Sequence, residues 1–156
     1  SDVYKRQSAR HKGASVTEVL VNCMIFNNGI HKKIVDKEFR ADRTILLRHG
    51  EKMIYGANND KGIVLDGLKL KSVTIGQDGY TMDDVLVHDA HCKDNTLHMM
   101  LAMMGGDMPV ALGIIRDVEA PTYDESVHAQ LKEVQEKMPC RTLDQFLRSC
   151  ETWEIK

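Results

Sequence analysis

One run near the N-terminus constrains the fold more than any other part of the sequence. Four of the seven residues at 15–21 are Val or Leu, a composition typical of a short strand buried on both faces of a parallel sheet. A Lys12-Gly13 turn signal precedes the run, and the Asn-Asn-Gly sequence that ends at Gly29 has the composition of a loop. The run therefore predicts an α/β fold and places Cys23 just beyond the end of a buried strand.

Short apolar runs predict further strands in the middle of the chain. Two strands are expected at residues 44–47 and 52–55, joined by a tight turn at 48–51. A short helix is expected before them, at residues 30–40. Additional strands are expected at residues 63–65, 68–75, 85–87 and 111–118.

Apolar residues at helical spacing dominate the later part of the sequence. They predict helices at residues 95–104 and 123–138 and a last helix from residue 143. The capping residues expected at their N-termini are Asp94, Thr122 with Glu125, and Thr142 with Gln145. The apolar stripe of the long helix, expected to be buried, consists of Val127, Leu131, Val134 and Met138.

Composition excludes several classes of protein. The 21 basic and 23 acidic residues give a net charge of −2, without the basic stripe that binding to nucleic acid requires. The longest apolar run, residues 99–104, has six residues, whereas a membrane-spanning helix needs roughly 18 or more. Four cysteines without a C-x-x-C pair do not suggest a disulfide-stapled scaffold. We therefore expect a cytoplasmic protein that binds neither nucleic acid nor a membrane.

Three places in the sequence are candidates for chemistry. A thiol at the end of a strand, at Cys23, suits an iron ligand or a nucleophile, or else a small buried apolar side chain. The segment from His88 through Asp89 and His91 to Cys92 places two His and a Cys within five residues at a strand end. It resembles half of a metal site, or its polar side chains make ordinary hydrogen bonds. His49, in the turn after residue 47, could contact an anion or could order the turn.

Taken in order, these segments resemble one family. Residues 11–29, HKGASVTEVLVNCMIFNNG, are similar to the run KG-x-S-hydrophobic-x-E-hydrophobic-L-x-x-C-x-x-F/Y-N of the β subunits of 2-oxoacid:ferredoxin oxidoreductases. Later segments agree with that family: LRHGEKMIYG at 47–56, DKGI at 60–63, VHD at 87–89, PVALGIIR at 109–116 and APTYD at 120–124. The form of the first run and of the turn at 48–51 is most similar to the 2-oxoglutarate branch.

This resemblance implies an enzyme that oxidatively decarboxylates a 2-oxoacid, with 2-oxoglutarate favoured, to an acyl-CoA and CO₂. It implies thiamin diphosphate with Mg²⁺ and a [4Fe–4S] cluster as cofactors, and an α subunit, ferredoxin and coenzyme A as partners and co-substrate. The cysteine of the family motif is a cluster ligand, which assigns that role to Cys23. No catalytic residue is assigned within this sequence.

The resemblance also implies a domain division. Residues 1–7 are expected to be a non-native lead, 8–29 the end of a thiamin diphosphate-binding domain, and 30–156 a small α+β C-terminal extension. The family's G-D-G-D motif and its three other cluster cysteines are absent from this sequence, so we expect a C-terminal fragment that is inactive and holds neither cofactor by itself. Two alternatives remain: a metal-dependent hydrolase using His88, Asp89 and His91, and a non-catalytic interaction domain.

Overall fold

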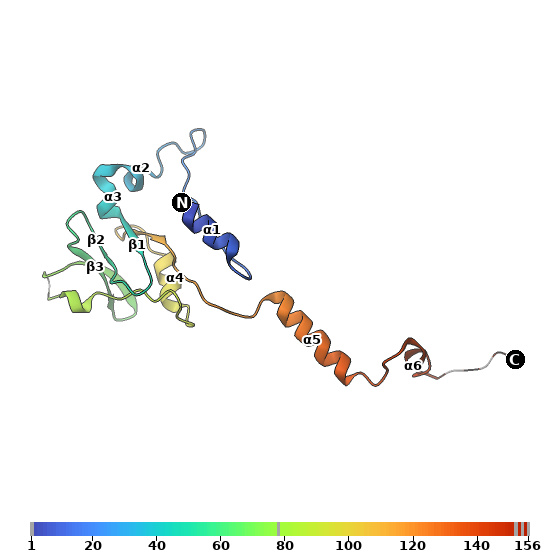
Figure 1. Ribbon diagram of the computed structural model, residues 1–156. Helices are drawn as coiled ribbons and strands as arrows, with labels where there is room; N and C mark the ends of the chain where they lie inside the picture. Colours follow the sequence, from blue (N-terminus) through green and yellow to red (C-terminus); the bar gives the residue numbers. More distant parts are fainter. Residues whose placement is uncertain (1, 78, 152, 154, 156) are drawn as a thin grey trace. The chain divides into compact units, whose positions relative to one another are not determined.

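The computed structural model describes residues 2–77, 79–151, 153 and 155. The chain divides into two compact units (Figure 1). The first contains helix α1 (Asp2–Arg10) and Val16–Glu119, and the second contains His11–Ser15 and the described residues from Ala120 onward. Helices and strands are mixed and include a parallel strand pair, which confirms the α/β prediction at that level.

Two strands far apart in the sequence form the parallel pair. Strand β1 (Thr44–Leu47) has the predicted bounds and runs beside β5 (Val110–Gly113), with Thr44 opposite Val110. The short helices α2 (Lys32–Val35) and α3 (Lys37–Arg43) precede β1. Along β1, Ile45 and Leu47 are buried while Leu46 between them is half exposed, which is the period of two that a strand imposes.

Three further strands form an antiparallel sheet. Strand β2 (Ile54–Tyr55) pairs with β3 (Lys61–Asp66), and β3 pairs with β4 (Lys69–Thr74). Gly67, at a φ of 60°, occupies the tight turn between β3 and β4, where a left-handed backbone favours glycine. The strands predicted at 63–65 and 68–75 are therefore present as a hairpin.

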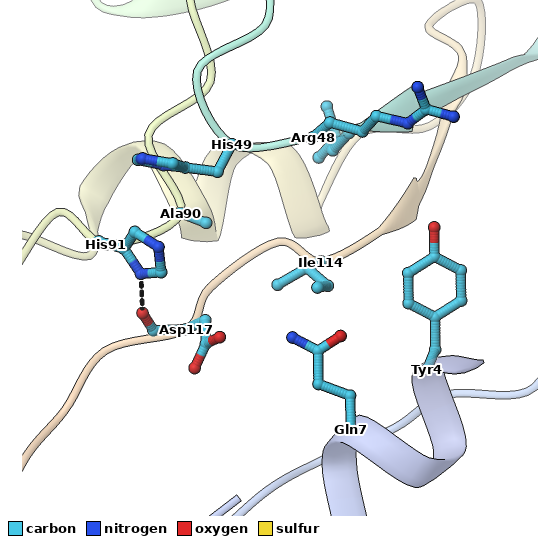
Figure 2. A pocket seen from close by; sticks show the side chains of 9 residues that line it. Tyr4, Gln7, Arg48, His49, Ala90, His91, Ile114 and Asp117 are labelled. Atoms are coloured by element: carbon cyan, nitrogen blue, oxygen red, sulfur yellow. Dashed lines mark hydrogen bonds between the residues drawn. The ribbon is translucent and has the colours of Figure 1, made fainter. Parts of the chain in front are cut away.

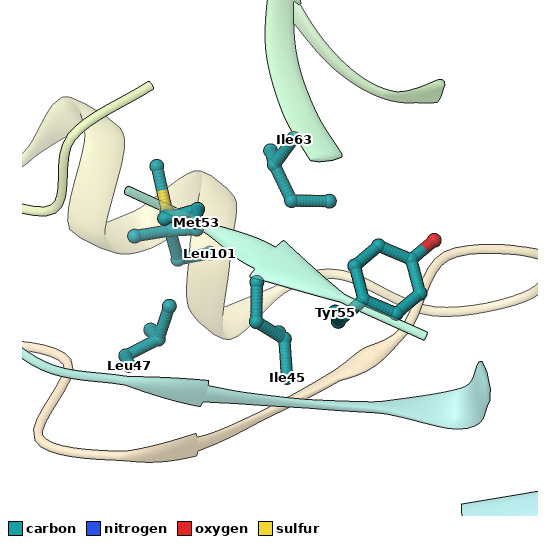
Figure 3. Close-up of a cluster of buried hydrophobic side chains, with 6 residues drawn as sticks. All are labelled: Ile45, Leu47, Met53, Tyr55, Ile63 and Leu101. Carbon is teal, nitrogen blue, oxygen red and sulfur yellow. The ribbon is translucent and has the colours of Figure 1, made fainter. Parts of the chain in front are cut away.

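The core of the first unit lies between β1, β2, β3 and α4 (Thr96–Ala102). Figure 3 shows Ile45 and Leu47 of β1 facing Leu101 of α4. The buried cluster consists of Ile45, Leu47, Met53, Tyr55, Ile63 and Leu101. Burial of such side chains contributes about 1.5–3 kcal/mol each relative to exposure. The N-cap of α4 is Asn95 and not the predicted Asp94, and its side chain makes no capping hydrogen bond. Asp94 Oδ1 accepts instead from the N–H of Thr96, the first residue of the helix, at 2.8 Å.

The turn at 48–51 does not form the predicted hairpin. The turn is present, but β1 pairs with β5 and β2 pairs with β3. It therefore carries the chain from one sheet to the other. The residues that lead into β2 pair with residues 85–88. The N–H of Met53 donates to the Leu86 carbonyl, and the N–H of His88 donates to the Glu51 carbonyl. The strand expected at 85–87 is reduced to an isolated bridge between Lys52 and Val87.

The prediction of a buried strand at 15–21 is wrong for the chain as described. These residues form no strand and are exposed, with Val16 at 99%. A strand that is buried on both faces needs neighbours on both sides, and none of the described residues pairs with this run. Its apolar side chains therefore face solvent.

The buried stripe predicted on the long helix is also wrong. Helix α5 (Tyr123–Lys137) has the predicted capping box, in which Thr122 Oγ1 accepts from Glu125 N and Glu125 Oε2 accepts from Thr122 N. Yet α5 has no buried residue, and Leu131 and Val134 are half exposed. Helix α6 (Leu143–Leu147) has its predicted Thr142–Gln145 cap and is likewise exposed. Across the described residues, no helix combines the length and apolar character that crossing a membrane demands.

Candidate functional site

The loop that carries Cys23 is closed by a neighbouring asparagine. Asn22 Oδ1 accepts from the backbone N–H of Gly29 at 2.8 Å, and Asn22 Nδ2 donates to Asn28 Oδ1 at 3.0 Å. The backbone closes the same loop, because Asn27 N donates to the Cys23 carbonyl at 3.1 Å. Gly29 lies at a φ of 80°, a conformation that favours glycine. The residues 22–29 therefore form a defined turn after the exposed run.

The thiol of Cys23 lies within this turn and is exposed. The backbone N–H of Phe26 donates to Cys23 Sγ at 3.5 Å. This contact, with smaller contributions from the N–H groups of Ile25 and Asn27, lowers the pKa of the Cys23 thiol. Hydrogen bonds to the charged form favour it, and the thiolate is the form that binds metals and acts as a nucleophile. The alternative of a small buried apolar side chain does not describe Cys23, which is exposed.

Cys23 would supply a single ligand to a metal centre. Within the described part of the chain, no three or more His, Cys, Asp or Glu side chains are arranged to hold a metal ion. Cys92, Cys140 and Cys150 are free thiols. An accessible thiolate surrounded by backbone N–H groups fits one ligand of an iron–sulfur cluster, since hydrogen bonds to cluster sulfurs are a usual means of tuning such centres.

The structure does not bring His88, Asp89 and His91 to one point. The His88 ring is 1% exposed and its Nε2 lies 2.8 Å from the Ile114 carbonyl. Asp89 Oδ1 instead accepts from the backbone N–H of His91 at 2.9 Å. The His91 ring is exposed, and its Nδ1 donates to the Asp117 carbonyl at 2.5 Å. Each group is thus occupied by an ordinary hydrogen bond, which is the second of the two interpretations that the sequence left open.

A hollow with a volume of about 260 Å³ lies at the carboxyl ends of β1 and β5. Figure 2 shows His49 and His91 on one side of it and Tyr4 and Gln7 of α1 on another. The His49 and His91 ring centroids are 4.3 Å apart, and His49 Nδ1 lies 3.4 Å from Asp89 Oδ1. The turn that contains His49 is also held by the backbone, because Gly50 N donates to the His88 carbonyl at 2.8 Å. His49 therefore lies beside the Asp89 carboxylate and lines the hollow, in a turn that the backbone holds.

His98 is a polar core residue that the sequence interpretation missed. It is 3% exposed, and its Nε2 lies 2.8 Å from the Asp89 carbonyl. Its position three residues before the buried Leu101 places it on the same face of α4. This spacing is the signal in the sequence, but the apolar residues of the same helix, Leu97, Met100, Leu101 and Met104, define its buried face without including a histidine.

Comparison with known proteins gives one informative similarity. The chain is 31% identical over 154 residues to the 2-oxoglutarate oxidoreductase subunit KorB of Mycobacterium tuberculosis. The matched region is 96% of this chain and 40% of KorB, so the chain spans less than half the length of this relative. No protein-family model and no solved structure matches the chain. The similarity agrees with the family resemblance of the sequence motifs.

Proposed function

We propose that this chain is the C-terminal part of the β subunit of a 2-oxoacid:ferredoxin oxidoreductase that acts on 2-oxoglutarate. The observation that carries the proposal is the 31% identity to KorB across 96% of the chain. The complete enzyme would convert 2-oxoglutarate and coenzyme A to the acyl-CoA and CO₂ and pass the released electron pair to ferredoxin. Its α subunit would be the partner of this β subunit.

In this proposal Cys23 is one ligand of a [4Fe–4S] cluster, which supplies one-electron transfer when bound. The lowered pKa of the Cys23 thiol and its exposure support that role. The N–H groups of residues 25–27 would stabilise negative charge on the ligating sulfur. A reducing cytoplasm, in which the four cysteines stay free, is the compartment that we propose.

The thiamin diphosphate and its Mg²⁺ belong to the part of the subunit that this chain does not include. None of the residues here matches the G-D-G-D motif, so no catalytic step is assigned to this chain. Residues 8–29 are proposed as the end of the thiamin diphosphate-binding domain and 30–156 as the C-terminal extension. The exposed Val16 and Val21 support this division, because a partner sheet would bury them. Residues 1–7 are proposed as a non-native lead.

The first test is the gene that encodes this sequence. Reading upstream of residue 8 in the parent gene should give a C-x-x-C motif and a G-D-G-D motif in one continuous frame. Their absence would remove the proposal.

The second test is the iron content of the complete α–β complex. Replacement C23A should lower iron and labile sulfide to well below wild type and abolish the reduced-cluster signal in electron paramagnetic resonance. C92A, which removes another exposed thiol, is the matched control and should leave both values unchanged. Undiminished cluster content in C23A would contradict the ligand assignment.

A further inference from the structure

Two histidine rings are buried at the junction of α4 with the segments on either side of it. His88 lies in the segment that pairs with residues 50–53, and His98 lies on α4. They are 1% and 3% exposed, and their ring centroids lie 6.2 Å apart in an edge-to-face arrangement. Few polar side chains are buried this completely unless they are hydrogen-bonded.

The hydrogen bonds of the two rings define their tautomers. His88 Nε2 faces the Ile114 carbonyl and His98 Nε2 faces the Asp89 carbonyl, each at 2.8 Å. A carbonyl oxygen only accepts, so both Nε2 atoms carry the hydrogen. In a neutral imidazole the Nδ1 atom is then an unprotonated acceptor. Both Nδ1 atoms are buried and have no hydrogen-bond partner among the described residues.

The two bonds connect three separate segments. His88 attaches its own segment to Ile114, directly after β5, and His98 attaches α4 to Asp89. A backbone bond from Asp117 N to the Ala90 carbonyl, at 2.8 Å, joins the first two segments again. The junction between α4, the 88–91 segment and the end of β5 therefore depends on both rings.

Protonation is unfavourable at this junction. A proton can enter only at Nδ1, where it would create a buried positive charge and an N–H without an acceptor. Burial accordingly lowers the pKa of His88, and the Ile114 carbonyl opposes this only in part.

The charged groups around the two rings do not make their protonation favourable. The neighbouring His98 and His49 also act to lower the pKa of His88, and Asp89 acts weakly in the opposite direction. Asp94 is the acid that interacts with His98, and it also interacts with Arg116 beyond β5. On β4, which packs against α4, Lys71 lies 3.6 Å from Asp66 and pairs with it.

We propose that the His88–His98 pair makes this junction acid-sensitive, so that α4 and the residues after β5 separate from the 88–91 segment when the rings take up protons. A group that binds its proton more weakly in the folded state stabilises that state above its unfolded pKa of about 6.5, and the stabilisation is lost as the pH falls below that value. If the His88 ring takes up its proton only in the open form, the opening equilibrium constant rises by up to about tenfold per pH unit below about pH 6.5.

The test is hydrogen–deuterium exchange of the α4 amides in the full chain, corrected for intrinsic rates, between about pH 7.5 and about pH 5.5. In the double variant H88Q/H98Q the glutamine N–H can still donate to the two carbonyls, but the side chain does not titrate. We expect the pH dependence of opening to disappear both in this variant and in H88Q alone. H128Q, which replaces an exposed histidine of α5, should keep the wild-type dependence. Retention of that dependence in the double variant would overturn the proposal.

Imidazole ¹⁵N spectra of the wild-type chain provide a readout that needs no variant. The His88 ring should remain neutral with hydrogen on Nε2 until the α4 amides lose their protection. A His88 ring that titrates while α4 stays protected would overturn the proposal as well. Neither outcome depends on the cluster at Cys23, so failure here leaves the proposed function intact.

Discussion

At Gly62 the backbone of β3 passes so close to Val85 that no side chain fits between them. A Cβ at this position would lie 2.6 Å from Val85 Cγ2, closer than any relaxed contact. Val85 is itself buried, so its side chain has little room to move. The steric limit at Gly62 therefore arises from packing and not from backbone conformation.

Replacement G62A should destabilise the first unit by about 1–3 kcal/mol, the usual cost of overpacking a core. The measurement is the free energy of unfolding from urea titration. G105A is the matched control, because no described atom lies within 4 Å of a Cβ there, and it should change stability by less than about 0.5 kcal/mol. The double variant G62A/V85A should recover part of the loss relative to the sum of its single variants. Equal stability of G62A and G105A would contradict the packing argument.

Residue identity alone did not reveal which histidines are buried. The segment at 88–91 was recognisable from its composition, but its sequence does not say that His88 faces inward and His91 outward. That difference comes from contacts with Ile114 and Asp117, which are distant in the chain. For Cys23 the sequence predicted a thiol in a loop, and the Phe26 N–H that lowers its pKa became visible only in the folded turn.

At the scale of elements, the N-terminus of α5 is held by a cap and an ion pair. Glu125 receives the N–H of Thr122 in the capping box and also pairs with Lys12 of the same unit. Lys12 has the largest effect on the Glu125 carboxyl. Together with the Thr122 N–H, it lowers the pKa of Glu125 to about 2. Because this pKa lies below its unfolded value, the interaction stabilises the folded form above about pH 4.5 and is lost as the pH falls toward 2.

The variant K12Q should raise the pKa of Glu125 while leaving it below the ordinary value, since the Thr122 N–H still donates to the carboxylate. The measurement is the ¹³C shift of the Glu125 carboxyl during acid titration. K137Q breaks the Lys137–Glu133 pair instead and should leave Glu125 unchanged. An identical Glu125 titration in wild type and K12Q would exclude the ion pair in solution.

Local signals predicted where elements begin but not what they pack against. The capping boxes at Thr122 and Thr142 were identified correctly, because each involves residues only three positions apart. The stripe of Leu131 and Val134 correctly indicated one apolar face of α5, but the described chain leaves this face uncovered. Periodicity indicates that a helix has an apolar face, but the segment that covers this face must come from elsewhere in the structure.

For the whole molecule, the buried residues are confined to one unit. The core from Ile45 to Leu101 lies within the first unit, and none of the described residues of the second unit is buried. Cooperative stability should therefore reside in the first unit, because burial of apolar surface is its main source.

A chain ending at Glu119 should unfold cooperatively, with a midpoint within about 4 °C of the full chain, a shift corresponding to roughly 1 kcal/mol or less. Differential scanning calorimetry provides the measurement. I63A in the chain ending at Glu119 is the positive control, because Ile63 is fully buried. Replacing its side chain by alanine should lower the free energy of unfolding by about 2–5 kcal/mol. If the truncation lowered the midpoint as much as I63A does, the second unit would contribute to the core.

The mixed class of the fold followed from the sequence, but its sheet pairing did not. The turn at 48–51 suggested a hairpin because adjacent strands in sequence often pair. In the structure Thr44 is opposite Val110, and no local pattern specifies a partner that distant. The same limit applies to residues 15–21, whose composition predicted a buried strand without indicating where its neighbours would lie.

The pairing of β1 with β5 has a consequence for synthesis of the chain. All of β2, β3, β4 and α4 lie between the two paired strands in sequence. While the ribosome adds these residues, the backbone of β1 has no strand partner, and Ile45 and Leu47 cannot be fully enclosed. Folding of this unit is thus expected to be completed late in translation, once Val110–Gly113 has left the exit tunnel, and a pause before that point would prolong exposure of an aggregation-prone edge.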